Sequence, residues 1–440
     1  MAYKPLDPRN QKPPSKTPGC FLSRPVCFSL VCGILSLALL HLLCCSPAGT
    51  QQAVLFPLRQ YINNTYSFIS SVPGEGIKNC NYSEGKWVWA PGHARRYNAT
   101  ECNVKERQDC LRNGRPDTGY LDWRWQPVGC PLPAFDARTF LSVVRGKHVA
   151  FIGDSMARNQ AQSLICLLTS AYPYRPYYRL LYRDVGQHRH NFWSYSFPSY
   201  NVKVSYYWAP FLVRGKGKPE DDAIRENHVH LDVPGDRWAA DADTIDVAVL
   251  AAGHWLLNGA IYYNGSEVIG AHNAPAELNY TRIGYAWPLH MAYWTAVERL
   301  SSGGGRQRTV VLATFSPSHF EGRPVDSPTA CTKMEPYKEG ERELEWIFKE
   351  VRDVVYEEAE LARARVGDGG RGGGATRIEV LDVTKLAWMR PDGHPSVYMN
   401  YHPFEHGVPE KMNSDCLHFC LPGPVDTFNE ILVQVLKKRR

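Results

Sequence analysis

Short apolar runs alternate with longer mixed stretches from residue 148 onward. The runs predict buried strands, and the stretches predict helices near 156–169, 284–300 and 339–365. The predicted strands are "HVAFIG", "NVKVSYYW", "IDVAVLAAG", "RTVVLATF" and "RIEVLDV". Because strands that alternate with helices form βαβ units, the pattern predicts an α/β fold whose mainly parallel sheet is flanked by helices.

The pattern differs before residue 148. Residues 80–135 hold four cysteines, the tryptophan-rich pieces "KWVWAP" and "LDWRWQP" and many turn formers, which is typical of a small disulfide-braced module. Residues 46–79 lack sustained periodicity and are predicted to be a stem. The predicted organisation is a tail at 1–25, an apolar span at 26–45, the stem at 46–79, the module at 80–135 and a larger domain at 136–440.

The segment from Val26 to Cys45 contains no charged residue over twenty positions, which is the length that a helix needs to cross a bilayer. Basic residues precede it and Arg59 is the next cation, so the amino terminus is predicted to face the cytosol and the remainder the lumen. A cleaved signal peptide is the alternative. The long apolar run, without a clean small-x-small cleavage site, favours the anchor.

Cysteines and glycosylation sequons agree with a lumenal position. Five of the thirteen cysteines lie in or beside the span, and the remaining even number fits four disulfides whose pairing stays open. These are Cys80, Cys102, Cys110, Cys130, Cys166, Cys331, Cys416 and Cys420. The sequons, all after the span, are at Asn63, Asn81, Asn98, Asn264 and Asn279. A zinc site at Cys416 and Cys420 is a weaker alternative, because no second ligand pair completes it.

The net charge of +6 is distributed in a way that argues against nucleic acid as a partner. Positive charge is concentrated in residues 1–25 and in "KKRR" at 437–440, and the body between them is slightly acidic. No basic groove for a phosphate backbone is visible, so nucleic acid is not an expected partner.

Ser155 carries the first candidate chemistry. It follows the predicted strand in "HVAFIGDSMARNQ", and ligands of such sheets bind outside the carboxyl ends of the strands. A serine needs a nearby base to become a nucleophile, and serine is also a favoured helix N-cap. The two roles are compatible, because backbone N–H groups at a helix amino terminus can stabilise an oxyanion.

Two segments offer a base. In "NSDCLHFCLPGPVDTFN", Asp415 and His418 are spaced so that one turn can place carboxylate beside imidazole, and flanking cysteines can fasten them. In "RPDGHPS", Asp392 and His394 lie in a turn-forming context and can also pair. Spacing alone leaves both open.

Two separated motifs carry a family resemblance. "FIGDSMARN" and "DCLHFCLPGPVDTFN" resemble the GDSxxRN and DCxHWCLPGxxDxWN signatures of the plant trichome birefringence-like family, and "CNYSEGKWVW", "GRPDTGYLDWRWQP" and the cysteine layout extend the likeness from Cys80 to about Val435. Members of that family are Golgi polysaccharide O-acetyltransferases with an esterase-like fold of the SGNH/GDSL type. The resemblance therefore implies a Golgi membrane protein with a single span, type II topology and a lumenal catalytic domain.

The resemblance also implies roles for residues. Ser155 is the implied nucleophile, His418 its base and Asp415 the orienting acid. Four further residues are implied to line the oxyanion hole or bind substrate: Gly153, Asp154, Arg158 and Asn159. Gly253 and His254 are expected to supply backbone donors at the end of a neighbouring strand, although the stretch that holds them departs from the family pattern. "AAGHW" departs from the Asn-Thr-Tyr stretch of the xylan-type members, and Phe419 stands where tryptophan is usual.

The implied reaction is acetyl transfer through an acetyl-serine intermediate to a hydroxyl of a hemicellulose, with xyloglucan the first choice. Mannan or xylan as acceptor, acetylester hydrolysis, a non-catalytic wall-polysaccharide binding protein and a chaperone-like partner of another acetyltransferase are the alternatives. No metal or bound cofactor is implied, the acetyl donor has no visible signature, and no feature indicates an oligomeric state.

Aromatic side chains are the candidates for contacting the acceptor, although most tryptophans in a globular body are packing residues. The candidates are Trp87, Trp89, Trp123, Trp125, Tyr206, Tyr207, Trp208 and Trp255.

Overall fold

The computed structural model describes residues 80–92, 96–98, 102, 104–176, 192–221, 223–302, 307–368 and 376–438. Within these ranges, no helix combines the length and apolar character that crossing a bilayer requires. The predicted tail, span and stem, together with the sequon at Asn63, lie outside the described residues.

A seven-stranded sheet forms the centre of the fold, in the order β13-β12-β9-β3-β6-β5-β4. Its first five strands are parallel, and β5 and β4 continue the sheet antiparallel at one edge. The bounds are β3 His148–Gly153, β4 Arg175–Pro176, β5 Phe192–Phe197, β6 Val202–Trp208, β9 Val247–Ala251, β12 Thr309–Ala313 and β13 Arg377–Leu381. The five predicted strands are these five parallel strands, so the predicted α/β fold with a mainly parallel sheet is confirmed.

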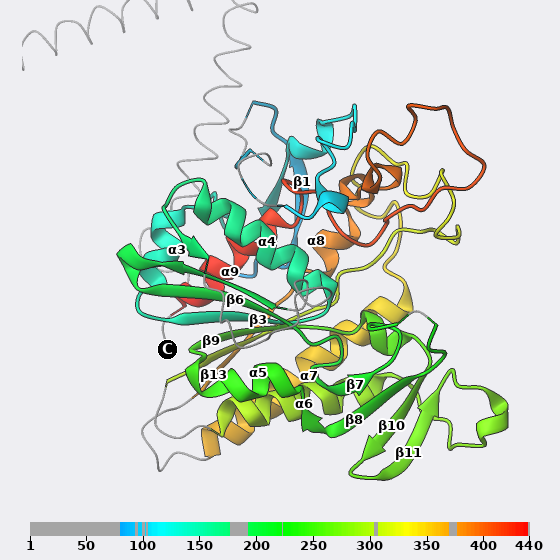
Figure 1. Cartoon of the computed structure of the whole chain (residues 1–440). Helices are drawn as coiled ribbons and strands as arrows, with labels where there is room; N and C mark the ends of the chain where they lie inside the picture. The colour runs from blue at the N-terminus through cyan, green and yellow to red at the C-terminus, as the bar shows by residue number, and fades with distance from the viewer. Residues whose placement is uncertain are drawn as a thin grey trace, which may run out of the picture. The chain divides into compact units, whose positions relative to one another are not determined.

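Helices cover both faces of this sheet (Figure 1). One face carries α3, α4 and α9, and the other carries α5, α6 and α7. Alternate residues of β3 enter the two cores: Val149 and Phe151 pack with α4 and α9, whereas Ala150 and Ile152 pack with α6. The bounds are α3 Ala137–Val143, α4 Ser155–Thr169, α5 Asp236–Asp241, α6 Ala286–Ser301, α7 Trp346–Asp368 and α9 Asp426–Lys437.

A second sheet of four strands, in the order β11-β10-β8-β7, was not predicted. Only β8 and β10 pair in parallel, and the other pairs are antiparallel. Helix α6 lies against β8, below the central sheet in Figure 1. The bounds are β7 Val213–Lys216, β8 Asn227–Pro234, β10 Ala260–Asn264 and β11 Glu267–His272.

The amino-terminal module contains one antiparallel pair, β1 (Gly85–Trp89) with β2 (Trp123–Pro127), in which Trp87 faces Trp125. The eight cysteines from Cys80 onward form four disulfides: Cys80–Cys130, Cys102–Cys166, Cys110–Cys420 and Cys331–Cys416. The predicted number is confirmed, and the zinc alternative is wrong because Cys416 and Cys420 are both oxidised to other partners. Two of the disulfides join the module to the rest of the fold.

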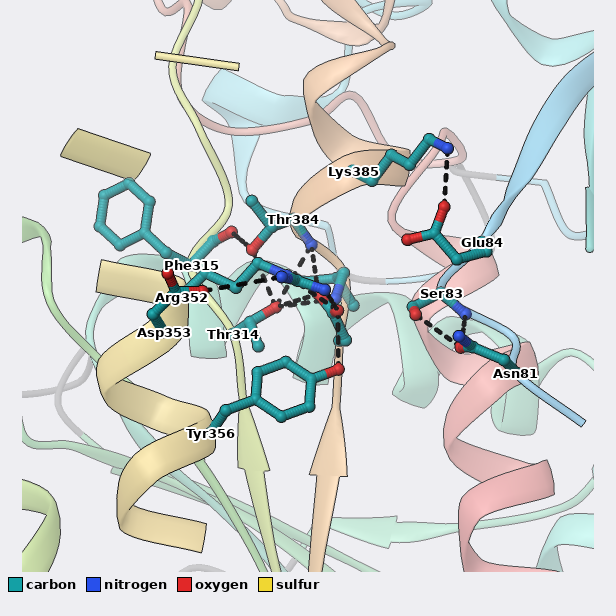
Figure 2. A network of polar contacts seen from close by, with 12 residues as sticks. Asn81, Ser83, Glu84, Thr314, Phe315, Arg352, Asp353, Tyr356, Thr384 and Lys385 are labelled. Carbon is teal, nitrogen blue, oxygen red and sulfur yellow. Dashed lines mark hydrogen bonds and ion pairs between the residues drawn. The ribbon is translucent and has the colours of Figure 1, made fainter. Parts of the chain in front are cut away.

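A buried polar network fixes the ends of β12 and β13 (Figure 2). Arg352 and Tyr356 of α7 donate hydrogen bonds to Oδ2 of Asp382 at 2.6–2.9 Å, while Thr314 donates to its Oδ1 at 2.9 Å. Asp382 is 6% exposed, and a buried carboxylate is tolerated when it is paired in this way. The network holds α8 (Thr384–Trp388), which leads into the segment 390–396 beside the candidate site.

Candidate active site

Ser155 begins α4 directly after the turn that ends β3. Gly153 has φ 156°, and a Cβ there would collide with the carbonyl oxygen of Ala251, so only glycine fits the turn. The N-cap is Asp154, whose carboxylate accepts a hydrogen bond from the backbone N–H of Met156 at 2.9 Å. Capping is therefore not the role of the Ser155 hydroxyl.

The amino terminus of α4 offers a donor for an oxyanion. The N–H groups of Asp154, Met156 and Arg158 have acceptors, whereas no acceptor for the Ser155 N–H lies among the residues that the structure describes. The helix dipole adds positive potential at this point. A backbone N–H beside the hydroxyl, at the positive end of a helix, is the arrangement that stabilises negative charge on an attacked carbonyl.

Asp415 and His418 form a hydrogen-bonded pair. His418 Nδ1 donates to Asp415 Oδ2 at 2.7 Å, and the backbone N–H groups of Leu417 and His418 donate to Oδ1 at 3.1 and 2.9 Å. Burial raises the pKa of the Asp415 carboxyl, but His418 and these hydrogen bonds outweigh burial and lower the pKa to about 2. The carboxylate is thus ionised at neutral pH and holds the proton on Nδ1, which leaves Nε2 to act as a base.

Asn159 joins this pair to the helix of Ser155. Its amide Nδ2 donates to the carbonyl oxygen of Phe419 at 3.1 Å, and its Oδ1 accepts from the Phe419 N–H at 3.0 Å. Ser155 and Asn159 are four positions apart on one helix, so they share a face. The residue after His418 is therefore fixed one turn away from Ser155. Both groups of the Asn159 amide are occupied, so the expectation that it contacts substrate is replaced by a positioning role.

Covalent links fasten the same segment from both sides. Cys416 is bonded to Cys331 and Cys420 to Cys110, so a disulfide lies on either side of His418. The backbones of Ser396 and Asp415 exchange hydrogen bonds of 2.9 and 3.1 Å. A base held this firmly keeps its orientation without a further ordering cost. In the described residues, Nε2 of His418 is buried and has no hydrogen-bond partner.

The alternative pair, Asp392 and His394, is not a catalytic dyad. The Asp392 carboxylate accepts two hydrogen bonds of 2.8 Å from buried Arg390. His394 Nδ1 donates to the carbonyl oxygen of His418 at 2.8 Å, and its Nε2 lies 2.6 Å from Nδ1 of His319. Burial lowers the pKa of His394 well below its ordinary value. His394 is 1% exposed, and its hydrogen bond to the His418 carbonyl supports the backbone of the candidate base.

Asp154 and His254 support each other instead of pointing to substrate. The His254 ring lies between Asp154 Oδ2, 3.1 Å from Nδ1, and the carbonyl oxygen of Ser316, 3.0 Å from Nε2. The ring also stacks on Phe315 with centroids 4.1 Å apart, and the His254 N–H is directed at Asp154 at 3.4 Å. The donor role expected of His254 is therefore corrected. Gly253 adopts φ 144° in the turn before it, where glycine is favoured.

Arg158 remains a candidate for contacting substrate. Its guanidinium lies 5.9 Å from the centre of the Trp208 ring, and its Nε has no partner among the described residues. Lys105 is a charged neighbour that the sequence did not reveal. Burial, followed by Arg158 and Arg107, lowers the pKa of Lys105 to about 8, and Asp415 acts in the opposite direction. Its place follows from the Cys110–Cys420 disulfide, a pairing that spacing does not predict.

Aromatic residues from the predicted acceptor set divide between core and site. Trp87, Trp125, Tyr206 and Tyr207 are buried and belong to the core, which corrects their assignment. Half-buried Trp208, the last residue of β6, forms an edge-to-face pair with half-buried Trp255, which follows β9, and their centroids are 6.3 Å apart. Trp89 pairs with Trp123 on the module, with ring centroids 5.2 Å apart.

The asparagines of four predicted sequons lie in the described residues, and each is exposed. They are Asn81, Asn98, Asn264 and Asn279.

The low pKa of Asp415 predicts a pH-dependent contribution to stability. Because its native pKa is about 2 against an ordinary 3.8, the carboxylate contributes about 2 kcal/mol above pH 4, and this is lost as the pH falls towards 2. We expect the free energy of unfolding of wild type to exceed that of Asp415→Asn by about 2 kcal/mol at pH 7, and by about half of that at pH 3. Urea unfolding at both values measures this, and a pH-independent difference contradicts the pairing.

Two families and several relatives match the chain. Residues 132–435 match the family described as "PC-Esterase: GDSL/SGNH-like Acyl-Esterase family found in Pmr5 and Cas1p", and residues 78–131 match "PMR5 N terminal Domain". The chain is 45% identical over 368 residues to Xyloglucan O-acetyltransferase 2 of Populus trichocarpa, covering 83% of each chain. It is 44% identical over 361 residues to Xyloglucan O-acetyltransferase 1 of Arabidopsis thaliana, covering 82% of this chain and 80% of that protein.

A more distant relative extends the same similarity. The chain is 32% identical over 376 residues to Protein trichome birefringence-like 25 of Arabidopsis thaliana, covering 84% of this chain and 80% of that protein. Serine after a glycine turn, the tethered Asp415–His418 pair and the parallel sheet agree with these matches. The chain belongs to the GDSL/SGNH-like PC-Esterase family and carries the PMR5 amino-terminal domain before it.

Proposed function

We propose that this protein is an O-acetyltransferase that transfers acetyl groups to hydroxyls of xyloglucan. One structural observation carries the proposal: His418 has Nδ1 bound by ionised Asp415, an Nε2 without a hydrogen-bond partner among the described residues, and a neighbour, Phe419, whose backbone is tied through Asn159 to the helix that Ser155 begins. The acceptor is inferred from the two xyloglucan O-acetyltransferases that are 44–45% identical to the chain over most of their length.

In the first step, the Ser155 hydroxyl oxygen attacks the acetyl carbonyl carbon of an ester or thioester donor. His418 Nε2 accepts the hydroxyl proton, and the resulting imidazolium is stabilised by the Asp415 carboxylate. The carbonyl oxygen becomes an oxyanion beside the Ser155 N–H. The donor's C–O or C–S bond then breaks, its leaving group takes the proton from His418, and acetyl-Ser155 remains.

In the second step, a xyloglucan hydroxyl attacks the acetyl-serine ester. His418 Nε2 accepts the proton of that hydroxyl, and the tetrahedral intermediate again places its oxyanion at the amino terminus of α4. The bond between the acetyl carbon and Ser155 Oγ breaks as His418 returns the proton to the serine. The same base thus serves both steps, which explains why its position is fixed by a carboxylate, by two disulfides and by the hydrogen bonds between Asn159 and Phe419.

A Golgi-lumen location with a type II anchor is part of the proposal. It is supported by the uncharged segment 26–45 with basic residues before it, and by four disulfides, which persist in oxidising compartments. The exposed asparagines of the described sequons are compatible with glycosylation there.

Product analysis tests the proposal against its alternatives. The full chain is incubated with an acetyl donor and xyloglucan, mannan or xylan oligosaccharides, and products are identified by mass spectrometry. We expect acetylated xyloglucan oligosaccharide as the main product. Release of free acetate without acetylated oligosaccharide would assign the chain to the acetylesterases. A stronger yield on mannan or xylan would replace the acceptor, and no reaction on any of them would favour a binding protein.

A further inference from the structure

An open hollow with aromatic walls lies beside the amino-terminal module, outside the site described above. Its volume is about 520 Å³, within the range of small-molecule and sugar sites. Its walls include Tyr398, Tyr401, His402 and Phe404 from one loop, with Gly114 and Pro116 from the module. Tyr401 is 67% and Phe404 39% exposed, so both rings present apolar surface at the hollow.

The loop that carries these rings starts and ends beside Asp415, the acid of the candidate triad formed by Ser155, His418 and Asp415. Residues 397–414 leave the fold after Ser396 and return at Asp415, and these two residues pair through both backbone hydrogen bonds. The loop that lines the hollow is therefore joined at its base to Asp415, the acid that orients His418. A polymer chain whose hydroxyl reaches the triad extends beyond it, so surfaces next to the triad are where further sugar residues pass.

The loop is held in place by the module. Asn113 Nδ2 donates to the Tyr398 carbonyl oxygen at 2.7 Å, and the His402 N–H donates to the Asn113 carbonyl oxygen at 3.0 Å. Gly114 packs so closely against the His402 ring that a Cβ would lie 2.8 Å from Nδ1. Tyr398 and Phe404 are edge to face with centroids 5.9 Å apart. Rings held in this way lose little freedom when a ligand binds.

We propose that this hollow is a subsite for the acceptor polysaccharide, in which Tyr401 and Phe404 contact the faces of sugar rings several residues from the one that is acetylated. The inference rests on the proposed function. Sugar rings present apolar C–H groups on their faces and hydroxyls at their edges, which suits exposed aromatic faces bordered by a few polar groups such as His402 and Glu405. A neutral acceptor also agrees with walls that contain a single carboxylate and no lysine or arginine.

The test compares Tyr401→Ala with wild type on xyloglucan oligosaccharides of increasing length. We expect KM for long oligosaccharides to rise about tenfold, the effect of losing one good ring contact, with kcat within about twofold. Short acceptors that do not reach the hollow are expected to show little change in KM. Tyr401→Trp, which restores an aromatic face, is expected to regain most of the affinity.

Tyr174→Ala is the matched control, because Tyr174 is 43% exposed and lies between the carboxyl end of α4, the end away from Ser155, and the edge strand β4. An unchanged KM in Tyr401→Ala, or an equal rise in Tyr174→Ala, overturns the subsite. A variant that changes oligomeric state in sedimentation instead assigns the hollow to self-association and also overturns it. Calorimetric binding of the oligosaccharide to Ser155→Ala, with and without Tyr401→Ala, tests the hollow even if wild type transfers no acetyl group.

Discussion

Ser155→Ala is expected to abolish acetyl transfer and to leave the fold intact. The hydroxyl oxygen is the atom that forms the acetyl ester, so kcat should fall by about 10⁴-fold or more. The hydroxyl does not cap α4, because Asp154 does so, and alanine is a good helix former. The free energy of unfolding should therefore change by less than about 0.5 kcal/mol.

Steady-state kinetics with donor and oligosaccharide, combined with urea unfolding, measures both quantities. Ser163→Ala is a matched control on the same helix. Ser163 is buried, donates to Asp426 and accepts a hydrogen bond from Asn429 at 2.9 Å, so its removal should lower stability while transfer continues. Retained transfer in Ser155→Ala would show that another group carries the acetyl group.

Asn159→Ala is expected to impair both stability and catalysis. The change leaves the buried N–H and carbonyl of Phe419 without partners, which should lower the free energy of unfolding by about 2–4 kcal/mol. It also releases the residue after His418 from the helix of Ser155. Since a displacement of about 1 Å can cost 100-fold in rate, we expect kcat to fall by about that factor.

The neighbouring variant Gln160→Ala separates the two effects. Gln160 is as buried as Asn159, but its side chain contacts Asn429 of α9 at 3.3 Å and not the His418 segment. Its loss should lower stability to a similar extent and change kcat by less than about threefold. If both variants reduce kcat equally, the hydrogen bonds between Asn159 and Phe419 have no specific part in positioning the base.

The parallel sheet was predictable because its strands are continuous apolar runs, as expected of strands buried on both faces. "HVAFIG" and "RTVVLATF" are of this kind and became β3 and β12. The second sheet was missed because β8, "NHVHLDVP", alternates apolar with polar residues, because β7 spans only 4 residues, and because β8 pairs with β10 across a long connection. Such pairing depends on contacts between residues far apart in the chain, such as those of β8 with α6, and the local sequence of a strand does not contain that information.

At the site, the sequence pointed to Ser155, Asp415 and His418 but left His394 as a rival base. The contacts that separate them are between residues far apart in the chain, such as Asn159 with Phe419 across 260 positions and His394 with the His418 carbonyl. Asp154, Asn159 and His254 were expected near the substrate because they lie in or beside the motif. They instead support the residues that hold the candidate nucleophile and base. A motif does not show whether one of its residues contacts substrate or supports a neighbour that does.

The most direct test of the central claim is peptide mass spectrometry of the full chain, quenched with acid after incubation with an acetyl donor in the absence of acceptor. We expect one acetyl group on the peptide that contains Ser155, and we expect it to disappear when xyloglucan oligosaccharide is added before the quench. An unmodified Ser155 peptide under conditions in which acetylated oligosaccharide is produced would contradict it.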